Sequence, residues 1–589
     1  MWRTAAAVVA ACLVVAGCGD SEPASEAPRH LDPRSDAVLS LSLDYDGASW
    51  QQVKRLYARA VQDGVIDEGE FTPPTLDGAL SAAAGSIGVS FADDVRPLLG
   101  GTLHVGVRVE PAEPLSAQAR DILERLDLDA TRFDRGPPEY VGRDGQPLAD
   151  VTPRQVRDAL DEQGSQQPDV TVTASYRVED AKALERLLGK LREQGLEPRP
   201  IDGIADAERL EEGVAIAGGD TLVLILPGDE QNADRLLRER LTGTGDGPQA
   251  PALEDGDLLA VRAAPTVLGS WLDREELGRA LATAAGRALR GAEARVRLDD
   301  DALRADARVD FEGLPDDALP LPAAAPLALP RGEAVASASA DQSATTVFLA
   351  GLARELYPDS RFVRRVERYE QEAGVRFEDE VLRQFAGPSF TVLRPGPGAG
   401  AGDGEGEVAF GARSSLRDPA AMRAQLDTLA PALPGILEGL QGLGSFGLTG
   451  LLFVAPDAPL TPSAFALLAQ VGVSRLPGTG ADALYEVRGL DEDGRLPGPD
   501  RVVYGTVGDA FVVASSPELA REVAAMETEP APEAATRLRA LVPEVTADLA
   551  DRLDLGEAEL LRAVIERVEA SASAKDGDVV ADAEVRWAP

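Results

Sequence analysis

Several residue types that carry chemistry are scarce in this chain of 589 residues. It has two cysteines, Cys12 and Cys18, and two histidines, His30 and His104. Beyond Cys18 there is therefore no thiol for cysteine catalysis, for a redox CxxC motif, for a zinc site or for an intramolecular disulfide. Two distant histidines offer no paired metal ligands and little material for a Ser–His–Asp arrangement. We predict no catalytic residue, no metal ligand and no cofactor.

Lysine is also scarce, although charge is not. Only Lys54, Lys182, Lys190 and Lys575 are lysines among 58 basic residues, which are outnumbered by 100 acidic residues to give a net charge of −42. The excess of arginine has two interpretations, a compositional bias toward arginine and alanine or a surface adapted to salt. No basic patch stands out against this acidic field, so we expect no nucleic-acid partner.

The N-terminal stretch MWRTAAAVVAACLVVAGC is typical of an export signal. One basic residue, Arg3, precedes an apolar run that is too short to span a bilayer comfortably. The run ends on Val15-Ala16-Gly17-Cys18, which resembles the lipobox of bacterial lipoproteins. That resemblance implies a signal peptide at 1–17, cleavage before Cys18, and a lipid on Cys18 that anchors an extracytoplasmic protein to the cell membrane. An uncleaved anchor and an ordinary secretory signal are the alternatives.

Residues 18–32 are rich in Gly, Ser, Pro and acids, which predicts a flexible tether. Acidic residues are repelled by anionic headgroups, so we expect the folded body to stand off from the membrane. The membrane is then a partner only through the lipid anchor.

The body contains one pattern twice. GVSFADDV at 88–95 is echoed by GVRFEDEV at 374–381. Three more matched pairs occur in the same order at similar separations: PRSDAV at 33–38 with PRGEAV at 330–335, Gly219-Asp220 with Gly508-Asp509, and ADARVDF at 305–311 with ADAEVRW at 581–587. The order and spacing predict an internal duplication, with a first repeat at 33–313 and a second at 330–589.

Local patterns predict the elements of each repeat. DAVLSLSLD at 36–44 and EAVASASAD at 333–341 alternate as half-buried strands, and the alanine face of the second predicts unusually close packing. A helix is expected to follow the first of these at 49–60, and strands follow the repeated motif at 103–109 and 389–395. The residues Asp93 and Asp379 are expected to cap a helical turn, with Val95 and Val381 pointing inward.

The C-terminal part of each repeat has its own signature. Hairpins are expected around the two Gly-Asp pairs. Helices are expected at 232–241, 273–290, 517–527 and 556–570, before two closing strands in each repeat. This mixed order favours an α+β fold with a largely antiparallel sheet. The proline-rich segment 314–329 predicts an extended spacer between the repeats, and an insertion at about 111–168 distinguishes the first.

The combination of DAVLSLSLD, Trp50, GVSFADDVRPLLGG, GDTLVL and GDAFVVASSPELA with a lipobox resembles an uncharacterised bacterial family of envelope proteins. That family is known only as a domain of unknown function. The resemblance implies a place in the cell envelope and lends no catalytic residue.

Candidate sites in the body have structural explanations. His104 shares a predicted strand face with Gly106 and Arg108, and its counterpart in the second repeat is Phe390, so we expect a surface or interface histidine. LDLDATRFDRG at 126–136 begins like a calcium loop but lacks its glycine and its final glutamate, because Pro138 stands there. The acids at 299–301 and 491–494 are expected in turns, with weak calcium binding as an alternative.

The apolar, glycine-rich stretch 435–455 is the most unusual segment. Its GxGxxG match at 442–447 follows a helical pattern and not a strand, which argues against a dinucleotide site. A core element is favoured, with a membrane span, a mobile lip over an apolar cavity or a membrane-touching loop as alternatives.

Three functions remain open at this point. The favoured one is a non-enzymatic, lipid-anchored binding or scaffolding protein for another envelope component. A carrier of a lipid or other apolar ligand is the first alternative. A carboxylate-based hydrolase of envelope polysaccharide is the second, because paired carboxylates can lie far apart in sequence.

Overall fold

The fold was analysed in a computed structural model. It describes residues 30–62, 73–86, 88–132, 139–142, 151–165, 168–195, 198–204, 206–211, 213–226, 233–242, 250–254, 256–270, 272, 274–315, 318–358, 360–385, 387–395, 408–441, 473–476, 482–488, 501–541 and 565–587.

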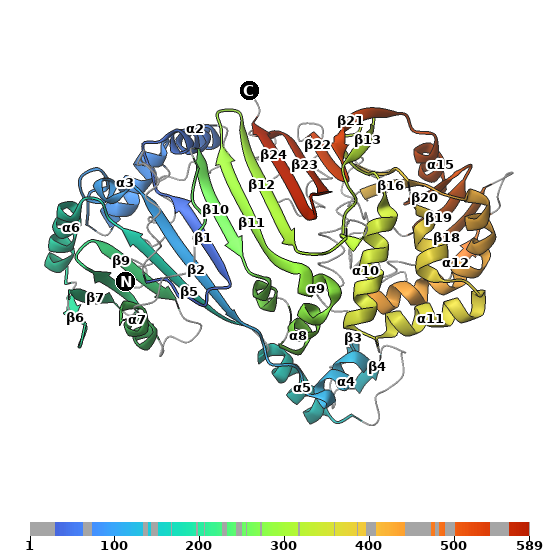
Figure 1. Cartoon of the computed structure of the whole chain (residues 1–589), viewed down its shortest axis with the longest axis horizontal. Coiled ribbons are helices and arrows are strands. Elements are labelled where there is room, and N and C mark those ends of the chain that lie inside the picture. The colour runs from blue at the N-terminus through green and yellow to red at the C-terminus, as the bar shows by residue number, and fades with distance from the viewer. Residues whose placement is uncertain are drawn as a thin grey trace.

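The molecule is built around one 20-stranded sheet with helices on both faces, which confirms the expected α+β class (Figure 1). Neighbouring strands in this sheet are antiparallel. From the outer edge to the centre, the strands of the first half are β6 (Arg199–Pro200), β7 (Ala207–Glu211), β8 (Val214–Ala217), β9 (Thr221–Leu226), β5 (Asp169–Arg177), β2 (Thr102–Glu110), β1 (Ala37–Ser42), β10 (Asp257–Ala263), β11 (Leu289–Leu298) and β12 (Ala302–Phe311).

The strands of the second half follow the same spatial order. From the outer edge they are β17 (Val473–Arg475), β18 (Ala483–Arg488), β19 (Arg501–Val507), β20 (Ala510–Ala514), β16 (Val408–Ser415), β15 (Ser389–Pro395), β14 (Val335–Ser339), β22 (Thr536–Leu541), β23 (Ile565–Lys575) and β24 (Asp578–Trp587). Each strand thus has a counterpart at the same place in the other half.

The halves join edge to edge through β12 and β24, which pair antiparallel across the middle of the molecule (Figure 1). Asp306 lies directly opposite Asp582, and Arg304 lies opposite Glu584. Asp306 and Asp582 also hold the same place in the matched sequences ADARVDF and ADAEVRW. The join therefore has an approximate two-fold axis at this pair, as in an isologous interface.

Each half carries helices on both faces of its part of the sheet. On one face, α2 (Ala48–Gln62), α3 (Leu76–Ser86) and α6 (Ala181–Glu193) cover the first half. On the corresponding face of the second half lie α10 (Gln342–Leu356), α11 (Arg361–Ala373) and α12 (Pro419–Gln441). On the opposite face, α7 (Ala233–Thr242) covers the first half and α15 (Pro517–Ala525) covers the second.

Both faces of β1 and β14 are covered, so the prediction of half-buried strands from their alternation is wrong. Ser40 of β1 is fully buried and every residue of β14 is buried. Ala336 and Ala338 of β14 pack against Leu327 and Leu329 of β13 (Ala325–Pro330), which pairs with β21 (Thr528–Ala534). The face of β14 that carries Ala336 and Ala338 does admit a close neighbour, as expected. The segment predicted as a spacer supplies that neighbour, so the end of 314–329 belongs to the core of the second half.

The repeated motif forms the same local structure twice. Residues Phe91–Val95 and Phe377–Val381 are π-helical turns, and both phenylalanines are buried. The predicted cap by Asp93 is wrong, because Ser90 caps this turn and its hydroxyl oxygen accepts from the N–H of Asp93 at 3.2 Å. Asp94, not Asp93, is buried and accepts a hydrogen bond from the backbone N–H of Ser90 at 2.8 Å. At the matching position, Glu380 accepts one from the N–H of Arg376 at 3.0 Å.

Three further expectations need adjustment. The end of the predicted tether is packed, because Leu31 and Asp32 are buried and Asp32 forms an ion pair with Arg240 of α7. The helix expected at 273–290 is two short helices, α8 (Arg274–Ala282) and α9 (Ala284–Ala288). The helix expected at 556–570 is wrong over its last residues, because β23 begins at Ile565.

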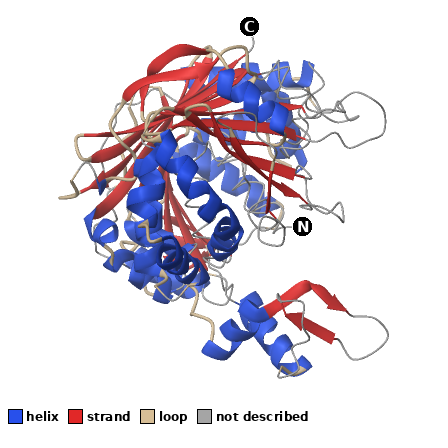
Figure 2. Ribbon diagram, turned by 90° about the vertical axis from the view of Figure 1, so that its right-hand side faces the viewer, coloured by secondary structure: helices blue, strands red, loops and turns tan. Residues whose placement is uncertain are grey.

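The insertion in the first half forms a small module that stands apart from the body (Figure 2). It contains α4 (Ala117–Arg125), β3 (Leu126–Arg132), β4 (Glu139–Gly142) and α5 (Pro153–Ser165). Ala119, Ile122, Leu126, Val156 and Ala159 form its own core.

Candidate functional site

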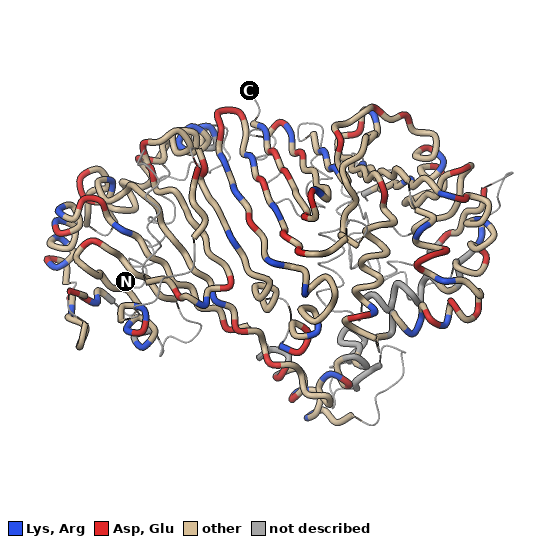
Figure 3. Tube along the Cα trace, in the orientation of Figure 1, with Lys and Arg blue, Asp and Glu red and all other residues tan. Residues whose placement is uncertain are grey.

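The join is formed by four strands, β11, β12, β24 and β23. Their charged residues lie on one face of the sheet, and the other face is lined by uncharged residues. Charged and uncharged residues alternate along them, as Figure 3 shows for β11 and β12. Because alternate residues of a strand point to opposite faces, the sheet here has one apolar face and one charged face.

The apolar face is named the alanine face. Its members stand in register across the four strands. They are Ala292, Ala294, Val296, Leu298, Leu303, Ala305, Ala307, Val309, Val568, Ala570, Ala572, Ala574, Val579, Ala581, Ala583 and Val585.

Most of the alanine face is only half-buried. Leu298 and Ala574 at its margins are buried, whereas Ala307 near its centre is exposed. A row of four alanines crosses the join at the position of Ala307. It consists of Ala294, Ala307, Ala581 and Ala572. Partly exposed apolar surface at the middle of a sheet is a candidate binding surface.

The position of the alanine face follows from strand register. It continues into the face of the first half that carries α2, α3 and α6, because Val261 and Leu39 extend the same row. In the second half it continues into the face that carries α10, α11 and α12. The alanine face thus lies between the helix layers of the two halves. At one end, α8 meets α10 through a cluster formed by Leu272, Leu277, Ala280 and Leu356.

The charged face is held by ion pairs that cross the strands. Arg304 of β12 donates to Glu584 of β24 at 3.1 Å, and Arg586 donates to the same carboxylate at 2.7 Å. Asp257 is buried between Arg295 and Arg297 at 3.2 and 2.7 Å. The hydrogen bond to Glu584 raises the pKa of Arg304. These arginines are paired with acids within the protein.

His104, the histidine of the predicted strand, lies in the sheet and not at an open site. Its Nδ1 is 3.1 Å from Oγ of Ser40, whose hydroxyl also donates to the carbonyl oxygen of Pro251 at 2.7 Å. Burial lowers the pKa of His104 to about 4, so the imidazole is neutral at neutral pH. Ser40 is fully buried and cannot reach a substrate. This supports a structural role for His104.

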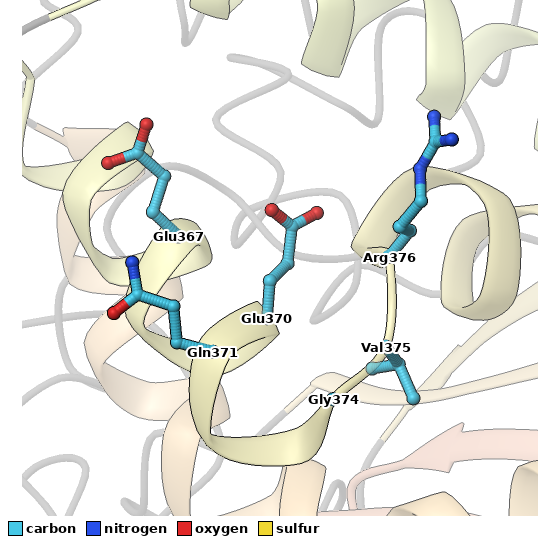
Figure 4. Close-up of a pocket in the computed structure, with 6 residues that line it drawn as sticks. All are labelled: Glu367, Glu370, Gln371, Gly374, Val375 and Arg376. Atoms are coloured by element: carbon cyan, nitrogen blue, oxygen red, sulfur yellow. The ribbon is translucent and has the colours of Figure 1, made fainter.

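A cavity of about 500 Å³ opens at the end of α11 (Figure 4). Glu367, Glu370, Gln371, Gly374, Val375 and Arg376 line it. Glu370 is already engaged, because it accepts from the backbone N–H of Phe377 at 2.8 Å and from Arg354 at 3.1 Å. The cavity therefore has an acidic wall that serves the local fold.

The remaining candidates from the sequence do not converge on a site. Residues 126–132 of the calcium-like segment form β3, and the acids at 299–301 form the turn between β11 and β12. Cys18, Pro138, the GxGxxG segment 442–447, the acids at 491–494 and the part of 435–455 beyond Gln441 lie outside the described residues. Within the described ranges, no three Asp, Glu, His or Cys residues are grouped to hold a metal ion. In the same part of the chain, no helix has the length and hydropathy of a membrane span.

The alanine face was missed at the level of sequence. ADARVDF and ADAEVRW were used only as markers of the repeat, although their alternation already separates Ala and Val from the charged residues. Only the pairing of β12 with β24 joins the two short patterns into one surface.

Comparison with known proteins adds no family. No family model, no curated protein sequence and no solved structure matches the chain.

Proposed function

We propose that this is a non-enzymatic, lipid-anchored extracytoplasmic protein that holds an apolar ligand, such as a lipid acyl chain, on the alanine face. The single observation that carries the proposal is the partial exposure of this face between the helix layers of the two halves. Lipidation at Cys18 would place the body within reach of membrane lipids. The motif at 15–18 supports that step by resemblance alone.

The alanines at the centre of the face favour an aliphatic ligand over a protein partner, and the aromatic residues that alternation puts on this face, Phe311 and Trp587, lie at its margins. Alanine is depleted in protein–protein interfaces, where aromatic residues, methionine and arginine are enriched. Small side chains instead leave room for a chain to lie flat along the strands, and small-molecule sites are largely apolar. The first alternative from the sequence, a carrier of an apolar ligand, therefore becomes the leading proposal.

We also propose that the two halves are copies of one α+β unit. The matched strand order and the equivalent position of Asp306 and Asp582 at the join support duplication. Two copies of the closing hairpin, joined by their edges, would create an apolar face twice as wide as either copy offers.

Adjacent residues of β24 provide a matched test. Ala581 lies on the alanine face and Val580 lies on the charged face beside Arg308. We expect native mass spectrometry of gently extracted protein to show a bound lipid. Ala581→Glu should lose it, whereas Val580→Glu should keep it because its charge lies on the other face. A wild-type protein without ligand, or retention by Ala581→Glu, would contradict the proposal.

A scaffolding role for another envelope component is the second candidate, and the projecting module favours it. Figure 2 shows that α4 and α5 extend away from the sheet, where a partner could reach them. Photo-crosslinkers at Asp121 on α4 and at Ala572 on the alanine face would separate the two. Crosslinking of one defined protein at Asp121 alone supports the scaffold.

The carboxylate hydrolase stays a prediction that screening against cell-wall glycans would test.

A further inference from the structure

Two carboxylates face each other at the centre of the join. Asp306 of β12 and Asp582 of β24 are direct partners in the antiparallel register, and both residues are exposed on the charged face. Side chains in such positions have Cβ atoms about 4.5–5.5 Å apart. Like charges placed directly opposite destabilise a sheet. Elsewhere on the same seam the chain uses opposite charges, as in Arg304 with Glu584.

The surroundings do not remove this repulsion fully. Arg295 of β11 lies opposite Asp306, but it forms ion pairs with Glu254 at 2.6 Å and Asp257 at 3.2 Å. Ser571 of β23, which carries no charge, lies opposite Asp582. Besides Arg295, the charged neighbours on this face of the four strands are Glu293, Arg297, Arg304, Arg308, Asp310, Arg567, Glu569, Lys575, Asp578, Glu584 and Arg586.

The neighbouring arginines are largely committed to other acids. Arg304 pairs with Glu584 and Asp299, and Arg308 pairs with Asp310 and Asp578. Burial, a hydrogen bond with Asp306 and the charge of Asp306 together raise the pKa of Asp582 above its ordinary value of 3.8, while Lys575 opposes the shift. Two carboxyl groups in hydrogen-bond contact hold one shared proton more firmly than an isolated aspartate does.

We propose that Asp306 and Asp582 form a proton-sensitive joint between the two halves. The joint tightens when the pair takes up one proton, because an O–H···O hydrogen bond then crosses the seam. It loosens when both carboxylates are ionised and repel each other. This inference does not depend on the proposed ligand, because it concerns only how firmly β12 and β24 are held together.

The direction of the pH effect follows from linkage. An acid whose pKa is higher in the folded protein than in the unfolded chain binds more protons when folded. The joint is therefore stabilised as the pH falls through the folded pKa, which lies above 3.8, and the stabilisation is lost as the pH rises past it. A seam held only by backbone hydrogen bonds would show no such dependence.

Amide hydrogen exchange along β12 and β24 of the whole protein tests the proposal. After correction for intrinsic exchange rates, we expect wild-type protection on these strands, measured relative to that of β14 and β15 in the same protein, to rise several-fold as the pH is lowered from neutral toward 4. Asp306→Asn and Asp582→Asn should each raise protection at neutral pH, because either change removes the repulsion. Each should also abolish the pH dependence. Both side chains are exposed, so neither change threatens folding.

Asp310→Asn is the matched control. It removes one negative charge from the same strand, but Asp310 is bonded to Arg308 at 2.7 Å, and this arginine also pairs with Asp578 and so compensates both acids. It should leave the pH dependence of β12 and β24 intact. The proposal is overturned if wild-type protection does not depend on pH, if the Asn variants keep the dependence, or if Asp310→Asn removes it.

Discussion

Individual residues show how the two halves use equivalent places differently. In the first half, Ser40 of β1 lies opposite His104 of β2, and in the second half Ala338 of β14 lies opposite Phe390 of β15. The first pair is polar and joined at 3.1 Å, whereas Phe390 belongs to the apolar core of its half. His104 therefore fills a place that the fold also fills with an apolar ring, which argues for a packing role.

That role predicts a pH effect on stability. The pKa of His104 is about 4 in the folded protein and about 6.5 in an unfolded chain. The unfolded state thus binds more protons, and stability falls as the pH drops from about 6.5 to 4. The difference corresponds to at most about 3 kcal/mol. Urea denaturation of His104→Asn at several pH values should show a smaller loss over this range than wild type. An unchanged loss would assign the pH dependence to the carboxylates instead.

At the scale of elements, periodicity predicted strands and helices well where burial of one face determines which positions are apolar. β2, β15 and α2 lie where alternation and helical spacing placed them. The glycine turns of the β8–β9 and β19–β20 hairpins were also visible, and Gly219 and Gly508 have the positive φ that such turns require. These features depend on local geometry, which a short sequence window contains.

Elements whose surroundings come from distant segments were harder to predict. Ser40 was expected on an exposed face but is buried, because a segment around Pro251 covers it. The start of β23 at Ile565 was assigned to a helix, since its residues before the alternating stretch are helix formers. The proline-rich segment before the second half was expected to be a spacer. Its leucines, which a spacer does not need, were the signal that it packs.

β13 provides the test at this scale. Leu329 is 2% exposed and packs in the core that includes the alanines of β14. Leu329→Ala should lower the free energy of unfolding by about 2–5 kcal/mol, because a cavity would remain where no side chain can move in. Leu226→Ala at the exposed end of β9 is the control and should change stability by about 0.5 kcal/mol or less. Denaturant titration measures both. Equal effects would restore the spacer interpretation.

At the scale of the whole molecule, the two halves touch through more than their sheet edges. β12 and β24 pair along one seam, and α8 of the first half packs on α10 of the second. Tyr357, which follows α10, also donates to Glu276 of α8 at 3.2 Å. The seam runs through the alanine face, and the α8–α10 contact ties the first half to the helix layer of the second half beside the proposed ligand site.

The helix contact predicts how the halves unfold. Leu356 is 2% exposed, and the buried side chains around it, Leu272, Leu277 and Ala280, belong to the first half. Leu356→Ala should therefore weaken the coupling between the halves as well as cost about 2–5 kcal/mol of packing. We expect calorimetry to show one transition for wild type and two separated transitions for the variant, since domains that lose their shared interface unfold independently. A single transition shifted to lower temperature would mean that the seam alone couples the halves.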